Sequence, residues 1–191
     1  MTPTISQCIG LWRRTLLIEA DGGRDTGTSV LWLQGISLFV DVRGPGEGFA
    51  GRLGQRGDVF EWDRLVDLQP PALPDAGRMS WAGDTLVEIG VHADYTEHWR
   101  AEPGSADPCW GVVVSARGAA GVLLRVGERF GWACPQEISL GMVSATDWRI
   151  TQSSDSCRIG AVLHPRLDSG QLRVDDDIAW DIDETEGSVE L

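Results

Sequence analysis

The fold of this chain is decided by residues 30–68, which read VLWLQGISLFVDVRGPGEGFAGRLGQRGDVFEWDRLVDL. Short apolar runs alternate here with turn sequences that are rich in glycine. The runs predict four strands, at residues 30–34, 38–43, 49–53 and 59–68. Gly44-Pro45-Gly46 and Arg56-Gly57-Asp58 offer the glycines that tight turns need. The pattern is typical of antiparallel strands joined by short turns.

The same rhythm continues on both sides of this stretch, with 24 glycines and nine prolines in 191 residues. No window carries the 3.6-residue apolar period of a helix, so we expect no helix longer than about two turns. The best break in the pattern is Pro103-Gly104-Ser105-Ala106-Asp107-Pro108. Further strands are predicted at residues 11–19, 78–81, 85–90 and 95–101 before this break, and at 110–116, 122–126, 130–134, 137–143, 147–152, 158–163, 171–174 and 178–181 after it.

So many strands must close or sandwich to hide their edges. We therefore predict an all-β protein with an antiparallel lipocalin-like (calycin) barrel, in one domain over residues 1–181. The barrel is built from residues 9–101 and is extended or capped by the second set of strands. The alternative is two barrels in tandem, the second one smaller, divided near residues 103–108. Residues 182–191 read as a frayed acidic tail whose removal leaves the melting temperature nearly unchanged.

The formal net charge is −13, and all the basic residues are arginines. Much of the acidity lies near the end of the chain, in Asp175, Asp176, Asp177, Asp181, Asp183, Glu184, Glu186 and Glu190. This charge balance argues against nucleic acid as a partner. No stretch approaches the roughly 18 continuous apolar residues of a membrane span, so we expect no membrane partner.

Four cysteines lie far apart, at positions 8, 109, 134 and 157. None forms a CxxC pair, so we expect reduced thiols packed as small apolar groups, with no metal and no cofactor. Residues 1–7 have neither a basic start nor an apolar core, which predicts no signal peptide. Both observations favour the cytoplasm. The sequence leaves the oligomeric state open.

Nine tryptophans are many for this length. Because side chains alternate between the faces of a strand, Trp12, Arg14, Leu16 and Ile18 are predicted to share one face. The same holds for Phe60, Trp62, Arg64 and Val66, and for Tyr95, Glu97 and Trp99. If the aromatic faces point inward, they carry arginines and a glutamate into the barrel. A pocket with aromatic walls and a few ionisable groups is how small-molecule sites are usually built.

Residues 92–100 form the segment richest in ionisable and reactive side chains, since they hold two histidines, the only tyrosine, two acids and an arginine. His92 and His98 would stand about 20 Å apart on a strand, which is too far for one metal. Tyr95 and Glu97 could exchange protons with a carbonyl or carboxylate substrate.

The sequence therefore leaves three hypotheses open. The first is an intracellular small-molecule-binding barrel with an aromatic, arginine-lined pocket for an amphipathic or anionic ligand. The alternative is a cofactor-independent lyase, isomerase or hydrolase with Tyr95 and Glu97 as catalytic groups. The third is a protein-interaction module whose barrel is filled by its own side chains. The predicted ligand-binding residues are Trp12, Arg14, Arg43, Trp62, Arg64, Glu88, His92, Tyr95, Glu97 and Trp99.

Several phrases of the sequence resemble a known family when they are taken together. They are Gly10-Leu11-Trp12-Arg13-Arg14, Leu38-Phe39-Val40-Asp41-Val42-Arg43, Phe49-Ala50-Gly51 and Asp94-Tyr95-Thr96-Glu97-His98-Trp99-Arg100. Over residues 9–101 the chain is similar to a fungal lipocalin-like family named for interacting with a casein-kinase-type protein kinase, and to its uncharacterised bacterial relatives. The resemblance implies a cytosolic β-barrel protein of unsettled activity, with no catalytic residues to carry over. The kinase partner belongs to the fungal proteins and is not transferred.

The predicted fold has a spectroscopic consequence. Far-ultraviolet circular dichroism should show mainly β signal, with helix well below the ~30 % that is usual in globular domains. A helix content at or above that level would rule out the predicted barrel fold.

Overall fold

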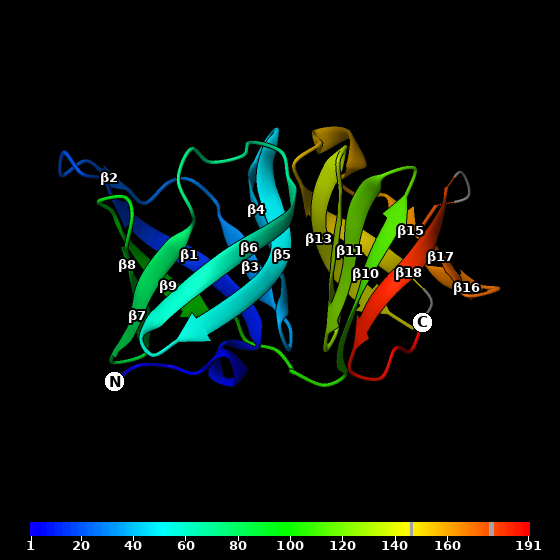
Figure 1. The fold of residues 1–191 in the computed structure, drawn as a ribbon, viewed down its shortest axis with the longest axis horizontal. Helices are drawn as coiled ribbons and strands as arrows, with labels where there is room; N and C mark the ends of the chain where they lie inside the picture. Colours follow the sequence, from blue (N-terminus) through cyan, green and yellow to red (C-terminus); the bar gives the residue numbers. More distant parts are fainter. Residues whose placement is uncertain (146, 176–177) are drawn as a thin grey trace.

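A computed structural model of the protein describes residues 1–145, 147–175 and 178–191. The described residues form two antiparallel nine-stranded sheets, which lie side by side in Figure 1. The predicted all-β class and the predicted barrel are thereby confirmed. Asp176 and Asp177 of the acidic run lie outside the described residues.

Eight strands of the first sheet close into a barrel. They follow the order β1-β3-β4-β5-β6-β7-β8-β9, and β9 pairs again with β1. The short strand β2 pairs with the last residues of β1. The strands are β1 (Gly10–Ile18), β2 (Arg24–Asp25), β3 (Leu31–Gln34), β4 (Leu38–Gly44), β5 (Glu47–Arg56), β6 (Val59–Asp67), β7 (Ala76–Ala82), β8 (Thr85–Gly90) and β9 (Thr96–Ala101).

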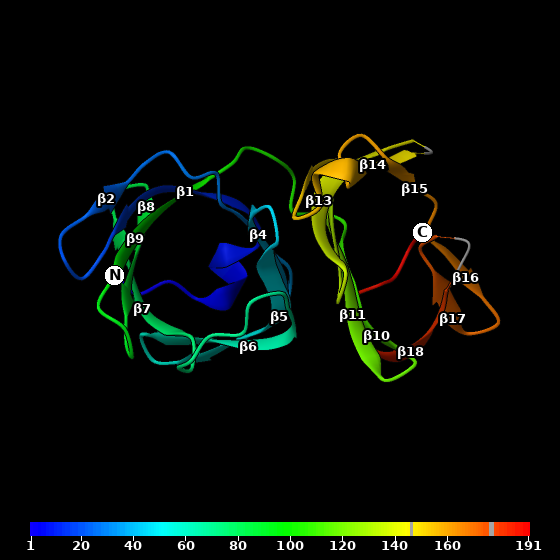
Figure 2. The same cartoon turned by 90° about the horizontal axis from the view of Figure 1, so that it is seen from above.

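The second sheet is curled, as the view in Figure 2 shows. Its order is β15-β14-β13-β12-β11-β10-β18-β17-β16, and no pair closes it among the described residues. Its strands are β10 (Cys109–Ala116), β11 (Ala119–Val126), β12 (Arg129–Cys134), β13 (Glu137–Ser144), β14 (Asp147–Ser153), β15 (Val162–Leu163), β16 (Arg166–Asp168), β17 (Gln171–Arg173) and β18 (Ala179–Glu186). The second set of strands is therefore a sheet of its own that packs beside the barrel.

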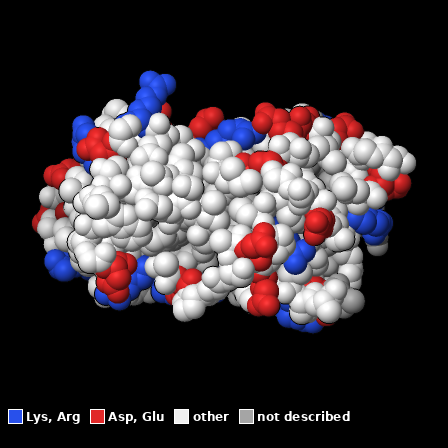
Figure 3. Space-filling view, turned by 90° about the horizontal axis from the view of Figure 1, so that it is seen from below, with Lys and Arg blue, Asp and Glu red and all other residues white. Residues whose placement is uncertain are grey.

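Aromatic side chains fill the middle of the first barrel. The Trp32 ring lies at its centre, with centroids 5.9 Å from Trp12, 6.2 Å from Trp62 and 5.7 Å from Trp99. The 3-10 helix η1 (Ile5–Cys8) lies at the lower end of the barrel in Figure 1. The Trp12 indole donates a hydrogen bond to the Cys8 carbonyl there, at 2.6 Å. Figure 3 views the molecule from this end, and charged side chains are sparse over the middle of the first barrel.

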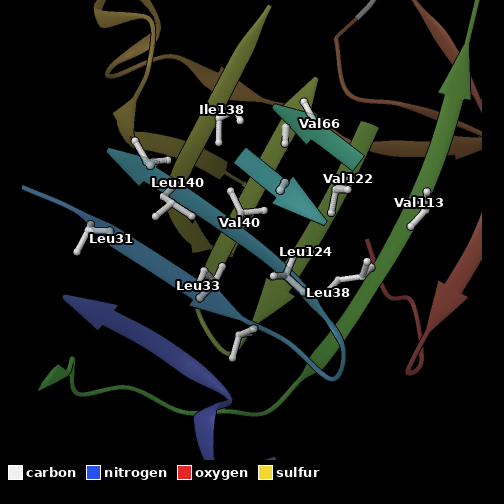
Figure 4. Close-up of a cluster of buried hydrophobic side chains, with 14 residues drawn as sticks. Leu31, Leu33, Leu38, Val40, Val66, Val113, Val122, Leu124, Ile138 and Leu140 are labelled. Atoms are coloured by element: carbon white, nitrogen blue, oxygen red, sulfur yellow. The ribbon is translucent and has the colours of Figure 1, made fainter. Parts of the chain in front are cut away.

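An apolar layer joins the two sheets. Strands β3 and β4 are buried on both faces: Trp32 and Phe39 point into the barrel, while Leu33 and Val40 point toward the second sheet. Figure 4 shows this outer row meeting side chains of the yellow-green strands of the second sheet. The second sheet contributes Val113, Val122, Leu124, Val126, Ala133, Ile138 and Leu140. The continuous apolar runs of β3 and β4 are thus explained by burial on both sides.

The end of the chain differs from the prediction. Strand β18 continues to Glu186 and pairs with β10, so Ile182–Glu186 is sheet rather than frayed tail. The Glu186 carboxylate accepts bonds from the Ser37 amide (2.8 Å), the Ser37 hydroxyl (2.7 Å) and the Leu38 amide (3.1 Å) of the first sheet. Prediction from the sequence also missed the short strands β2 and β16. Of the strand predicted at residues 158–163 only β15 (Val162–Leu163) forms, and Arg158 is the last residue of the 3-10 helix η2 (Ser156–Arg158).

None of the elements among residues 1–145, 147–175 and 178–191 is a helix long and apolar enough to span a membrane.

The bonds of Glu186 predict that the chain end stabilises the first sheet. Glu186→Ala should lower the free energy of unfolding by about 2–3 kcal/mol, because hydrogen bonds to a charged group are lost and two backbone amides lose their partner. Urea denaturation followed by tryptophan emission measures the change. Glu190→Ala is the matched control and should leave stability within about 0.5 kcal/mol. Equal effects of the two substitutions would contradict this role of Glu186.

Candidate functional site

A pocket of about 400 Å³ opens at the end of the first barrel away from η1, the upper end in Figure 1. Its polar floor is made by Arg14 of β1, Arg43 of β4, Arg64 of β6 and Glu97 of β9. The proline-rich segment after β6 and the segment before β9 form its rim, which includes Pro71, Ala72, Leu73, Pro74, His92, Ala93 and Tyr95.

Irregular strand pairing accompanies each of the three arginines. The β1–β9 register shifts between Arg14 and Leu16, the β4–β5 register shifts across Arg43, and the β5–β6 register shifts just after Arg64. Such bulges are common at barrel rims, where they redirect side chains. As a result Leu17 lines the pocket, whereas the sequence predicted Leu16 and Ile18 on the face of Arg14. Val66 likewise packs in the layer between the sheets, so its predicted place on the Arg64 face is wrong.

Arg14 is the most deeply buried of these arginines, with 6 % of its side chain exposed. One terminal nitrogen bonds Glu97 at 2.7 Å, and the other bonds Asp25 at 3.1 Å. A buried charge is tolerated only when partners satisfy it. Arg14 and Glu97 therefore depend on each other to stay inside the barrel.

Arg64 and Arg43 flank the ring of Phe49. The guanidinium carbon of Arg64 stands 3.5 Å from the ring centroid, and that of Arg43 stands 4.9 Å away. Arg64 uses its terminal nitrogens on Asp67, at 2.8 Å, and on Asp75. Arg43 uses its Nε on Asp41, at 2.9 Å, and its Nη1 lies 4.0 Å from Glu97.

A second polar group lies beside this cluster. Buried Glu88 of β8 accepts the Tyr95 hydroxyl at 2.7 Å and the Trp99 indole N–H at 3.1 Å. Gly77 and Gly90, which pair across β7 and β8, make room for it. A Cβ at Gly77 would come within 2.5 Å of the Glu88 side chain, and one at Gly90 would come within 2.5 Å of the Tyr95 ring.

Burial controls the ionisation of these acids. It raises the pKa of Asp41 from 3.8 to about 6, although the charge of Arg43 opposes the shift. It also raises the pKa of Glu88, which the negative charge of Glu97 raises further. The pKa of Tyr95 is raised by burial and by Glu88. The Tyr95 hydroxyl therefore stays protonated at neutral pH.

The predicted ligand-binding residues divide into two groups. Arg14, Arg43, Arg64, His92, Tyr95 and Glu97 line the pocket together. Trp12, Trp62 and Trp99 pack around Trp32 in the barrel core, and Glu88 lies behind Tyr95. Trp62 also lines a neighbouring pocket of about 430 Å³ beside the proline-rich segment. Sequence analysis did not identify Asp41, which bonds Arg43, or Asp67 and Asp75, which bond Arg64.

The other reactive side chains form no comparable site. Among the described residues, no group of three or more histidines, cysteines or acids is arranged to hold a metal. Burial raises the pKa of Cys8 to about 12 and that of Cys109 to about 11, so both stay as thiols near neutral pH.

A smaller pocket of about 260 Å³ lies in the second sheet, against Trp132 and Trp180. Its arginine, Arg158, holds Glu137 through two bonds of 2.6 and 3.2 Å and Asp175 through a third of 2.9 Å. Because carboxylates already occupy these donors, this pocket has less polar binding capacity than the pocket in the first barrel.

The fold and the pocket define a β-barrel protein with a charged cavity at one barrel end and a second, curled sheet at its side. No protein family and no curated protein matches the sequence. A solved structure with a similar fold is that of the uncharacterized protein YLR301w from Saccharomyces cerevisiae. The two share 13 % sequence identity with a TM-score of 0.64, over 93 % of this chain and 98 % of the yeast chain. At this identity the likeness shows a common fold.

The raised pKa of Asp41 predicts a pH-dependent part of the stability. The folded state binds this proton more tightly than the unfolded chain, whose aspartate has a pKa near 3.8. The protonated Asp41 carboxyl therefore contributes to the free energy of unfolding below about pH 4, and this contribution is lost as the pH rises through about 6.

Asp41→Asn should remove this component. Between pH 4 and 7, the stability of the wild type relative to the variant should fall by up to about 3 kcal/mol, the equivalent of a two-unit shift. Urea denaturation at a series of pH values measures it. Asp63→Asn, on the exposed face of β6, is the control. Parallel pH profiles for the wild type and Asp41→Asn would contradict the assignment.

Proposed function

We propose that the first barrel binds a small amphipathic molecule in the pocket at its open end, with an anionic group of the ligand on Arg43. The observation that carries this proposal is the free hydrogen-bonding capacity of Arg43. Its two terminal nitrogens donate no hydrogen bond to any described residue, and 29 % of its side chain is exposed. A guanidinium with a free fork suits a carboxylate or a phosphate.

The other two arginines of the pocket are less available. Each terminal nitrogen of Arg14 and of Arg64 already bonds a carboxylate. Only 6 % of the Arg14 side chain and 15 % of the Arg64 side chain are exposed. These two arginines hold the floor in place, and Arg43 is the one that meets the ligand.

The rest of the pocket fits an apolar ligand body. Leu17, Leu73 and the prolines of the rim offer apolar surface above the charged floor. The volume of about 400 Å³ falls in the range of small-molecule pockets, which are mostly apolar with a few placed polar groups. An amphipathic ligand with its charged group at the floor and its apolar body at the rim matches this arrangement of the pocket.

Binding is better supported than the two other hypotheses. The Tyr95 hydroxyl donates to Glu88 and Glu97 is held by Arg14, so Tyr95 and Glu97 do not share a proton directly. Catalysis by this pair stays a prediction. A barrel wholly filled by its own side chains is disfavoured by the pocket, although the aromatic core does fill the middle of the barrel.

The biological setting is part of the same proposal. The net charge of −13 supports a small molecule, rather than nucleic acid or a membrane, as the partner. Four free cysteines fit a reducing compartment, the cytoplasm. The sequence phrases support a distant relationship to the lipocalin-like family.

The role of Arg43 predicts the behaviour of variants. Small amphipathic acids, amino acids among them, are screened by thermal shift, and native mass spectrometry of the purified protein looks for a molecule already bound. Isothermal titration of a ligand so found should show that Arg43→Gln weakens binding by about 1.5–3 kcal/mol, the loss of hydrogen bonds to a charged group.

Two further variants serve as controls. Arg43→Lys keeps the charge but loses the fork, so it should recover only part of the affinity. Arg56→Gln, at the exposed last residue of β5, should bind like the wild type. Equal losses from Arg43→Gln and Arg56→Gln, or no binding of any screened molecule together with an empty protein in the mass spectrum, would refute the proposal.

A further inference from the structure

The charges around Arg43 narrow the chemistry of the ligand. The pocket is lined by three arginines, Arg14, Arg43 and Arg64, and by three acids, Glu19, Asp75 and Glu97. Three positive and three negative charges cancel. Directly behind them, Asp25 and Asp67 bond the arginines and add negative charge. The floor as a whole is therefore not cationic, in spite of its arginines.

A simple anion fits this surface poorly. A carboxylate on the fork of Arg43 would lie close to Glu97, whose Oε1 is 4.0 Å from Nη1 of Arg43. With 5 % of the Glu97 side chain exposed, little water screens the repulsion. The terminal nitrogens of Arg14 offer such an anion no hydrogen bond, because they already bond Glu97 and Asp25. The ligand needs a positive group for Glu97 as well as a negative one for Arg43.

Resting on the proposed function, we propose that the ligand is an α-amino acid with an apolar side chain. The free carboxylate lies on the fork of Arg43, and the ammonium group lies on Glu97. The opposite charges of Arg43 and Glu97 are neighbours, 4.0 Å apart. In an α-amino acid the carboxylate and the ammonium are bonded to one carbon, so its two charges are neighbours in the same way. The side chain then lies against Leu17, Pro71 and Leu73 at the rim.

The electrostatics of the pocket favour such a ligand over a molecule that carries only the carboxylate or only the ammonium group. The ammonium relieves the repulsion between the bound carboxylate and Glu97. The carboxylate in turn occupies Arg43, which would repel a simple amine. Both charges of the ligand gain an oppositely charged partner beside the buried Glu97 carboxylate, so the two contacts support each other.

Three molecules of equal apolar body test this directly. Phenylalanine carries both charges, 3-phenylpropanoate carries the carboxylate alone, and 2-phenylethylamine carries the ammonium alone. Isothermal titration on the full chain at pH 7 should give phenylalanine an affinity about tenfold or more above either analogue, the usual effect of losing one charge-assisted contact. Arg43→Gln should bring phenylalanine down to the level of 2-phenylethylamine, and Arg56→Gln should change none of the three.

The outcomes separate this inference from the proposed function. Binding of 3-phenylpropanoate as tightly as phenylalanine would overturn the amino-acid class and leave an anion site at Arg43 standing. Failure of all three probes, while the mass spectrum shows another molecule bound, would also overturn the class alone. Failure of all three with an empty protein and no hit in the screen would remove the proposed function too. Because the test varies the ligand, it does not require a variant at Glu97, which could fail to fold.

Discussion

Burial of β3 and β4 on both faces is the constraint on which the rest of the molecule depends. Their inner row packs around Trp32, and their outer row packs against the second sheet. Each buried aliphatic side chain contributes about 1.5–3 kcal/mol relative to exposure. With five apolar outward residues on these two strands alone, namely Leu31, Leu33, Leu38, Val40 and Val42, the barrel wall cannot face water. The second sheet is therefore required by the composition of the first.

This anchored wall also carries the polar floor of the pocket. Strand β4 sends Val40 and Val42 outward into the apolar layer and turns Asp41 inward, with Arg43 reaching the pocket at the strand end. The aromatic core lies beneath the charges and excludes water from that side. Carboxylates and arginines that would be weakly coupled at a surface are thereby held in fixed pairs, and a pocket at the barrel end can be polar without loosening the core.

Much of this could be predicted from the sequence, and the errors have local causes. The period of two in residues 59–64 correctly placed Trp62 and Arg64 on one face, and six predicted residues meet in one pocket. Bulges after Arg14 and after Arg64 then reversed the faces of Leu17 and Val66, and nothing in the residue types marks a bulge. The three tryptophans were read as pocket walls because alternation cannot distinguish the middle of a barrel from its end. The pairing of Arg14 with Glu97 joins residues 83 apart, which a single sequence does not connect, whereas Asp41 and Asp67 lie within three residues of the arginines they bond.

The joint between the sheets has a consequence for synthesis on the ribosome. By residue 101 the emerging chain holds every strand needed to close the first barrel, since β9 pairs with β1. The strands that cover its outer wall come later in the chain, and Glu186, which caps the turn before β4, follows them. Between closure of the barrel and synthesis of these strands, the nascent chain thus presents an apolar surface of the kind through which chains tend to aggregate and which chaperones shield. Synthesis of β10 to β13, which bring Val113 to Leu140 into the apolar layer, removes that hazard.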